Sequence, residues 1–302
     1  MSNNSKDTSP ALPPILYKYM SQAGFLGIIE SKSIWATDIF YLNDAAEYYH
    51  AVDMIRNEID KKSKDIVIPL TGFSGAKLDA VKVVHKKDVQ KHFLGVLNNM
   101  IGHLSDFHIF VCSFSEAPDL LSQWRGYCPG GSGLCVGFDS SSLVKYFKAE
   151  NYRIEQCVYD FDKQKEKISD MLDQYLEDIP QVETSDTLAY MAGPQTNNFI
   201  NEFFQIAPIY KDPSFSEEQE WRFISKPMPY GIPYVEYREG LSMIIPYNNV
   251  NIFRNDSNLP IKHVIIGPTP HPKLSIGSVK GLLISSGITA DVSESCCPYR
   301  EW

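Results

Sequence analysis

The chain has 302 residues and a net charge of −9, with 43 % hydrophobic and 22 % charged residues. This composition excludes a disordered chain, and the acidic balance speaks against binding to duplex nucleic acid, which needs a basic surface. No apolar run reaches the about 18 residues of a membrane span, so no contact with membranes is expected. The polar stretch 1–14 has no signal-peptide pattern. We predict a disordered tail there and a cytoplasmic protein with reduced cysteines.

Elements follow from apolar spacing and turn residues, taken in chain order. In the first half we predict strands at 15–19, 33–37, 107–114 and 134–138, and helices after an N-cap at Ser21, at 45–61, at 86–104, near 119–127 and at 143–147. In the second half we predict strands at 153–159, 220–224, 234–237, 241–245, 261–266 and 291–292, and helices at 163–177, 186–206 and 275–285. Gly193-Pro194 should break or kink the helix 186–206.

This mixture of helices and strands without strict alternation predicts an α+β fold with mainly antiparallel sheets and flanking helices. We expect a single domain over 15–302, with helical insertions around 45–105 and 162–206. Residues 62–85 have no clear period and predict a loop.

The stretch 216–224 switches from acidic residues to Trp-Arg-Phe-Ile, which is typical of a charged loop entering a buried strand. If the strand begins near Glu220, the side chains of Glu218, Glu220 and Arg222 share one face. Two carboxylates beside a guanidinium could stabilise a cationic transition state, hold a sugar hydroxyl or bind a metal. A surface row of ion pairs is the structural alternative.

Other polar or aromatic segments interrupt the apolar pattern where a core would not require them. We predict that the residues of these segments, together with Arg222, bind a cofactor: Tyr17, Lys18, Tyr19, Trp35, Thr37, Tyr41, Asn43, Asp44, Trp124, Arg125 and Tyr127. Each also has a structural interpretation: the aromatic rings as half-buried packing, Asn43-Asp44 as a helix cap, and Arg125 as an ion-pair partner of Asp119 or Glu220. The glycine loop 130–133 lacks the lysine and the spacing of a phosphate loop.

Several of these segments together resemble a bacterial family catalogued as a domain of unknown function. The matching segments are Leu16–Tyr19, Trp35–Asp44, Trp124–Phe138, Glu218–Arg222, and Ile266–Pro268 with Pro298–Arg300. The resemblance spans nearly the whole chain, and it implies no activity.

The order of these elements is also similar to the ADP-ribosyltransferase superfamily, through its opening polar strand, its second strand with a threonine and its late E-x-E strand. This resemblance implies that Lys18 or Tyr19 holds NAD, and that nicotinamide stacks near Thr37 or Tyr41. It also implies that Glu220 stabilises the oxocarbenium-like transition state, and that Glu218 positions the acceptor. Arg125 or Arg222 would suit the pyrophosphate. The first strand offers Tyr17-Lys18-Tyr19 where that superfamily has His or Arg.

The predicted function is therefore that of an NAD-dependent ADP-ribosyltransferase or NAD glycohydrolase, acting as a toxin or anti-phage defence effector. NAD would be its substrate, and the sequence does not identify a macromolecular acceptor. One alternative is a non-catalytic module that senses or binds a nucleotide. A second is a metal-dependent nuclease with Asp44, Glu47, Glu218 and Glu220 as oxygen ligands, although no histidine or cysteine spacing predicts a metal site.

Overall fold

The structure is a computed structural model that describes residues 10–42, 45–66, 86–128, 133–179, 185–253 and 259–298. Within these ranges no helix is both long and apolar enough to cross a membrane. Asn43, Asp44 and residues 67–85 of the predicted loop 62–85 lie outside the described residues, as do the glycine-loop positions 130–132. The loop prediction is wrong for residues 62–65, which continue the helix Ala45–Asp65.

The described strands form one large sheet and one small one. The large sheet has the order β12-β11-β5-β1-β4-β2-β10-β9, and off this path β7 pairs with β4 and with β6. Its strands are β1 (Ile15–Ser21), β2 (Ser33–Asp38), β4 (Phe110–Ser115), β5 (Gly133–Asp139), β6 (Arg153–Gln156), β7 (Glu220–Ile224), β9 (Glu236–Glu239), β10 (Ile244–Asn251), β11 (Ile261–Ile266) and β12 (Asp291–Glu294). The small sheet pairs β3 (Phe107–His108) with β8 (Met228–Pro229).

All of the described strand pairs are antiparallel except the pair of β11 with β12. The predicted α+β class, with a mainly antiparallel sheet and flanking helices, is therefore confirmed. One predicted cap is confirmed as well, because the Ser21 side chain accepts a hydrogen bond from the Gly24 N–H at the start of its helix.

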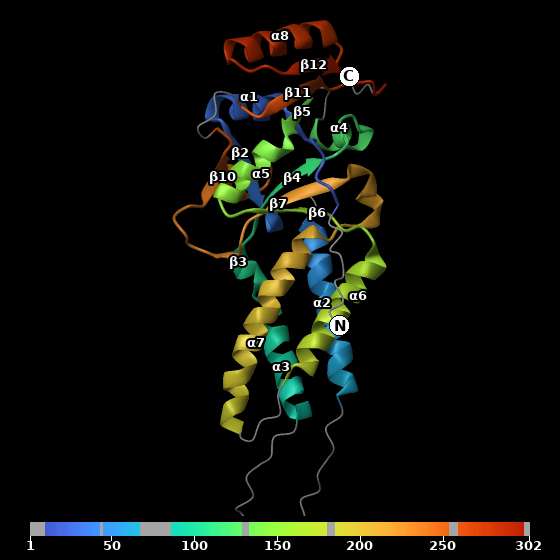
Figure 1. The fold of residues 1–302 in the computed structure, drawn as a ribbon, viewed down its shortest axis with the longest axis vertical. Coiled ribbons are helices and arrows are strands. Elements are labelled where there is room, and N and C mark those ends of the chain that lie inside the picture. The colour runs from blue at the N-terminus through green and yellow to red at the C-terminus, as the bar shows by residue number, and fades with distance from the viewer. Residues whose placement is uncertain are drawn as a thin grey trace, which may run out of the picture.

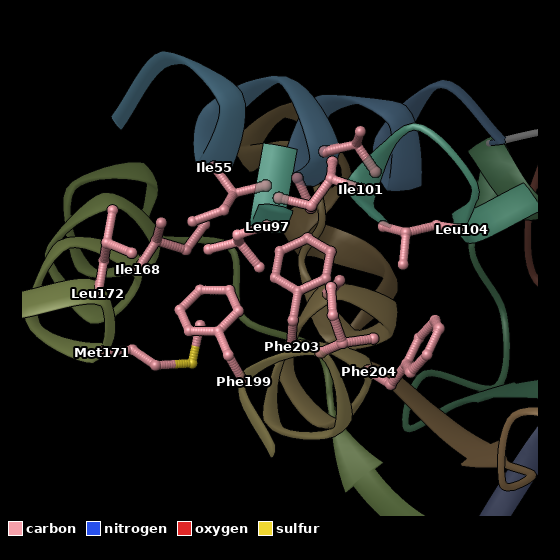
Figure 2. Close-up of a cluster of buried hydrophobic side chains, with 14 of the residues drawn as sticks. Ile55, Leu97, Ile101, Leu104, Ile168, Met171, Leu172, Phe199, Phe203 and Phe204 are labelled. Atoms are coloured by element: carbon pink, nitrogen blue, oxygen red, sulfur yellow. The ribbon is translucent and has the colours of Figure 1, made fainter. Parts of the chain in front are cut away.

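Four long helices lie together at one end of the molecule, beyond the sheet (Figure 1). They are α2 (Ala45–Asp65), α3 (Lys86–Ile101), α6 (Phe161–Glu177) and α7 (Ser185–Ile206). Their apolar side chains meet in one cluster, in which Leu97 of α3 and Phe199 and Phe203 of α7 are fully buried (Figure 2). Spacing of three or four residues puts these side chains on one stripe of each helix, which explains why the helices pack as a bundle.

A second core covers one face of the sheet. It is built on β1, β4, β5 and β7 and is closed by α1 (Gln22–Ser31), α5 (Ser140–Ala149) and α8 (Pro272–Ser285). Trp221 and Phe223 of β7 and Phe114 of β4 point into it. The helix α8 lies at the end of the molecule opposite the bundle (Figure 1).

Two strands, β1 and β2, pair with the same edge of β4 at its opposite ends. One edge of β4 pairs with β7 along Val111–Ser115. The other edge pairs with β2 near Val111 and with β1 only at Ser115. Between these two pairings, the backbone of β4 has no strand partner on that edge within the described residues. The strands β1 and β2 therefore diverge, and a gap opens beside Ser113.

Some predicted bounds differ from the structure. The helix α7 continues through Pro194. Of the two predicted outcomes at Gly193-Pro194, a break or a kink, the break is therefore wrong. Proline removes one backbone donor, and packing of the residues beyond it, such as Phe199 and Phe203, maintains the helix. The predicted strand 153–159 ends at Gln156, and the predicted helix 86–104 ends at Ile101.

Candidate active-site cleft

The strand β7 separates its charged residues from its aromatic ones. Trp221 and Phe223 point into the sheet core, whereas Glu220 and Arg222 share the opposite face because successive side chains alternate. All of these residues are buried, and Glu220 is only 5 % exposed. The alternative of a surface row of ion pairs is therefore wrong for this strand.

Glu218 lies outside the strand, which corrects the expectation that it would share the strand face. It ends the 3₁₀ helix η5 (Pro213–Glu218), and Gln219 then adopts a left-handed backbone conformation with φ of 45°. The hydroxyl of Ser115 donates a 2.6 Å hydrogen bond to the carbonyl of Glu218 and fixes this turn against β4. The turn returns the Glu218 side chain toward Glu220 by a route that strand alternation does not describe.

Lys211, which the sequence analysis did not single out, joins the two carboxylates. Its Nζ lies 2.5 Å from Oε2 of Glu220 and 2.7 Å from Oε2 of Glu218. Arg222 binds Glu220 from the other side, with Nε donating to Oε1 at 2.6 Å. The guanidinium also donates to the Pro208 carbonyl at 2.8 Å. We call Glu218, Glu220, Lys211 and Arg222 the charge cluster. It holds two acids and two bases, so its formal charge is balanced.

The cations determine the protonation of Glu220. Burial alone would raise the pKa of this carboxyl, but the charges of Arg222 and Lys211 and their hydrogen bonds outweigh burial and lower the pKa to about 2. Glu220 is therefore an anion at any physiological pH. Burial lowers the pKa of Lys211, but the carboxylates have the larger effect and the net shift is upward. Both partners thus stay ionised, and their side chains are held in one geometry.

The two carboxylates open on a cleft where the sheet diverges. The cleft has an empty volume of about 370 Å³, its open mouth included. Its lining combines tyrosine rings, one lysine, small hydroxyl side chains and carboxylates: Tyr17, Lys18, Tyr19, Ser113, Phe114, Ser115, Gln123, Tyr127, Glu218 and Glu220. The structure thus brings together Tyr17, Lys18, Tyr19 and Tyr127 with Glu218 and Glu220, which all come from the predicted set.

Strand register explains this convergence. Tyr17 of β1 lies opposite Ser115 of β4, and Ser115 lies opposite Glu220 of β7. Directly opposed residues of antiparallel strands share a face, so the three side chains form a row across the sheet. With neighbouring strands about 4.8 Å apart, Tyr17 and Glu220 are separated by about 10 Å along this row. A small ring system or a sugar would fit between them.

Lys18 occupies the gap between the diverging strands. Its Nζ donates a 3.0 Å hydrogen bond to the carbonyl of Ser113, at the part of β4 that lacks a strand partner on that edge. The same ammonium lies 5.3 Å from the centre of the Phe114 ring, which is within the range of a cation–π contact. The cleft therefore has a fixed positive charge on one side and two carboxylates on the other.

The short helix α4 (Leu121–Tyr127) forms another wall. Trp124 is fully buried, packs edge-on against Tyr19 with ring centres 4.8 Å apart, and donates from Nε1 to Asp119 at 2.6 Å. Tyr19 in turn donates from its hydroxyl to the carbonyl of Ala117 and accepts from the Leu120 N–H. Trp124 therefore supports the wall from behind and is not itself a lining residue, whereas Arg125 is exposed on the same helix.

The other predicted residues lie elsewhere. Trp35 is 47 % exposed on β2, with its ring against Tyr247 and under the guanidinium of Arg238. Thr37 lies opposite Val111, on the same sheet face as Glu220 but four residues farther along β4 than Ser115. Tyr41 is half-buried after β2. None of the three is among the lining residues of the cleft, and Arg222 lies behind Glu220.

Sequence reasoning missed several residues of the cleft. Lys211 stood in a loop with no motif, and Gln123, Ser113 and Ser115 are ordinary residues at their positions. Ser113 and Ser115 are two residues apart, so a strand through them places both side chains on one face of the sheet. Nothing local indicated Lys211, because its partners are set by the folding of the chain around η5.

A metal at the carboxylates would compete with Lys211. The ammonium lies between Glu218 and Glu220, in the position that a cation bound by both would take. Among the described residues no group of three or more His, Cys, Asp or Glu side chains is arranged to hold a metal ion.

Comparisons with known proteins give few matches. A family model described as "Protein of unknown function (DUF2971)" matches residues 123–223, about a third of the chain, and this segment includes Gln123, Glu218 and Glu220. No curated protein matches. Among solved structures, DarT of Thermus sp. 2.9 in complex with NAD+ is 12 % identical, with 95 % of this chain and 97 % of that chain covered and a TM-score of 0.32.

The same DarT in complex with ADP-ribosylated ssDNA is also 12 % identical, with 95 % and 96 % of the two chains covered and a TM-score of 0.31. At such TM-scores the likeness carries no argument about the activity of this protein. The functional interpretation therefore depends on the cleft.

Proposed function

We propose that the protein cleaves NAD at the nicotinamide–ribose bond and transfers ADP-ribose to an acceptor or to water. The observation that carries this proposal is the row Tyr17–Ser115–Glu220 across the diverging sheet. It places Tyr17 and the ionised Glu220 on one face of the sheet, with their backbones about 10 Å apart. An aromatic base that leaves a sugar needs these two features, a surface for the ring and an anion for the sugar.

The chemistry follows from the charge that develops. When the C–N bond breaks, nicotinamide leaves as a neutral ring and positive charge builds on the ribose. Glu220 is ionised at neutral pH, and a fixed anion near the sugar stabilises this cation more in the transition state than in the ground state. Lys211 and Arg222 hold the carboxylate in place, so no reorganisation is needed at the moment of reaction. Their positive charges also reduce the field of Glu220, and Glu218 adds a second carboxylate beside it.

The remaining lining residues have roles that fit their chemistry. In the proposal Tyr17 and Tyr19 contact the nicotinamide ring, and Glu218 orients the acceptor, or a water in the glycohydrolase case. Arg125, exposed on α4, is the proposed contact for the pyrophosphate, because Arg222 is committed to Glu220 and Pro208. The cleft is open at its mouth, so in the proposal the nicotinamide and its ribose enter it and the rest of the dinucleotide extends outside.

The biological role that we propose is that of a bacterial effector, a toxin or an anti-phage defence protein in the cytoplasm. Consumption of NAD or modification of a macromolecule would both fit such a role. The acceptor is left open in this proposal.

The test is release of nicotinamide from NAD by the wild-type protein, E220Q and E218Q, measured by chromatography. We expect release by the wild type and a loss of at least about 100-fold in E220Q, as is usual when a group that stabilises transition-state charge is removed. E218Q should lose less in the presence of water alone. The control E166Q changes an exposed glutamate on α6 and should leave the rate unchanged.

The variants must be folded for this comparison, so each is first checked by thermal unfolding. Absence of release by the folded wild type under all acceptor conditions would contradict the proposal and favour a nucleotide-binding module. Unchanged release by folded E220Q would contradict the role of Glu220 alone.

A further inference from the structure

One side chain of the cleft wall has an amide without a hydrogen-bond partner among the described residues. Gln123 lies on α4 and is 7 % exposed, and it is part of the cleft lining. Within the described residues its carboxamide takes part in no hydrogen bond, whereas the neighbouring buried polar side chains Ser115 and Glu220 do. The amide therefore depends on water in the open cleft for its hydrogen bonds, and a ligand that displaces this water must offer matching groups.

The surroundings keep Gln123 in place. The next residue, Trp124, is locked by its hydrogen bond to Asp119 and by the Tyr19 ring. Asp119 also accepts hydrogen bonds from the Ser295 hydroxyl and the Cys296 N–H, so the C-terminal segment holds the base of α4. The backbone of Gln123 is thus fixed from behind, and its side chain lines the cleft. A side chain held in this manner is prepared for a ligand and need not be reorganised on binding.

We infer that Gln123 recognises the carboxamide group of the nicotinamide ring. This inference rests on the proposed function and names a specificity residue for it. A carboxamide presents one N–H donor side and one carbonyl acceptor side. Its best partner is a group with the same pair in reverse, as in a second carboxamide, and this pairing gives two hydrogen bonds at once.

The charges of the cleft support a neutral partner at this position. Lys18 and the carboxylates of Glu218 and Glu220 can bind charged groups, but each of them offers only donors or only acceptors. Gln123 is the lining side chain that offers both from one planar group. A ring that carries a carboxamide, placed near Tyr17 and Tyr19, would satisfy this amide and leave its ribose toward Glu220.

The test compares small ligands that differ only in this group. Nicotinamide carries a donor and an acceptor, 3-acetylpyridine keeps the acceptor and lacks the donor, and nicotinic acid replaces the amide by an anion. Dissociation constants are measured by NMR titration for the wild type, Q123L and Q123E. Q123L keeps a similar side-chain volume without hydrogen-bonding atoms, and Q123E exchanges the donor for an acceptor. The control S122A changes an exposed neighbour on the same helix.

We expect the wild type and S122A to prefer nicotinamide over 3-acetylpyridine by about tenfold, because one missing hydrogen bond to a buried group costs about this factor. In Q123L the preference for nicotinamide over 3-acetylpyridine should fall to within about twofold, because leucine can accept or donate no hydrogen bond to either ligand. A purely structural role for Gln123 would weaken both ligands equally and leave the ratio unchanged.

An unchanged ratio in folded Q123L, or a wild type that binds no nicotinamide, would overturn the inference. The outcome is separable from the proposed function. If the wild type releases nicotinamide from NAD but Q123L keeps the preference for nicotinamide over 3-acetylpyridine, the proposed function stands and the role of Gln123 is contradicted. If the ligand preference depends on Gln123 but no nicotinamide is released from NAD, recognition of the carboxamide stands and the proposed catalysis is contradicted.

Discussion

Two buried acids of this protein have opposite environments. Glu220 is bound by two full cations, Lys211 and Arg222, and opens on the cleft. Asp38 is fully buried at the end of β2, and its carboxylate accepts a 2.5 Å hydrogen bond from Nδ1 of His108. Neighbouring cations lower the pKa of Glu220 to about 2, whereas burial raises the pKa of Asp38 above its ordinary value in spite of His108.

The difference shows what separates a site from a structural pair. Asp38 also caps the 3₁₀ turn after β2 through the Phe40 N–H, and His108 is stacked between Phe110 and Tyr230. All of these contacts connect neighbouring segments of the fold, and none of them lies at the cleft. The charge cluster instead has its carboxylates at the wall of a cleft, together with rings and a lysine. Burial of a charged group therefore does not identify a functional site by itself. A ligand must also be able to reach the group, as it can at the wall of the cleft.

The largest expected effect is that of removing Lys211. K211M leaves Glu218 and Glu220 with one cation fewer in a buried place, and breaking a buried ion pair typically costs about 3–5 kcal/mol. Urea denaturation at neutral pH measures the change in the free energy of unfolding. The matched control is K62M, which breaks the half-exposed pair of Lys62 with Asp173 and should cost no more than about 1 kcal/mol.

The double variant E218Q/K211M should recover part of this loss, because it also neutralises one of the two carboxylates that Lys211 binds. Equal effects of K211M and K62M would show that the charge cluster is as solvated as a surface pair.

The second effect is a pH dependence of opposite sign at the two acids. The folded-state pKa of Glu220 is lowered from 4.5 to about 2, so its contribution to stability is present above about pH 4.5 and is lost as the pH falls toward 2. At about 1.4 kcal/mol per unit, this contribution is about 3 kcal/mol. The pKa of Asp38 is raised, so its ionised form destabilises the fold and acidification relieves that penalty.

Denaturation curves of the wild type, E220Q and D38N between neutral and acidic pH separate these signs. The difference in the free energy of unfolding between wild type and E220Q should shrink as the pH falls below 4.5. The corresponding difference between wild type and D38N should not shrink, because acidification relieves the penalty of the ionised Asp38. Parallel curves for wild type and E220Q would contradict the low pKa.

The smallest effect concerns the cost of D38N at neutral pH. Asparagine keeps an acceptor for the Phe40 N–H and removes the charge from the bond to His108, so we expect a loss of about 1–2 kcal/mol, typical of a hydrogen bond to a charged group. Nicotinamide release should be unaffected, since Asp38 does not belong to the cleft lining. A stability loss as large as that of K211M would mean that the two environments are equivalent.

Much of the fold could be predicted from local patterns. The apolar stripe of α3, the Ser21 cap and the alternation of Glu220 and Arg222 with Trp221 and Phe223 all depend on neighbours in sequence. Because these patterns arise from the periods of helix and strand, the sequence alone predicts them.

The parts that could not be predicted depend on long-range placement. Lys211 reaches Glu218 and Glu220 only because η5 and the left-handed Gln219 fold the chain back. The divergence of β1 from β2 along β4 depends on pairing between distant segments, because Tyr17 pairs with Ser115 and Thr37 with Val111. Gln123 has no motif at all, and only its lack of a partner in the folded chain draws attention to it.

The central claim is that the cleft between β1, β4 and β7 holds the nicotinamide riboside part of NAD. It is tested most directly by a crystal structure of the wild-type protein with a carbocyclic NAD analogue, whose nicotinamide cannot leave. We expect the nicotinamide ring beside Tyr17 and Tyr19, its carboxamide at Gln123 and its ribose toward Glu220. An analogue bound away from this cleft, or a saturated crystal with an empty cleft, would contradict the claim.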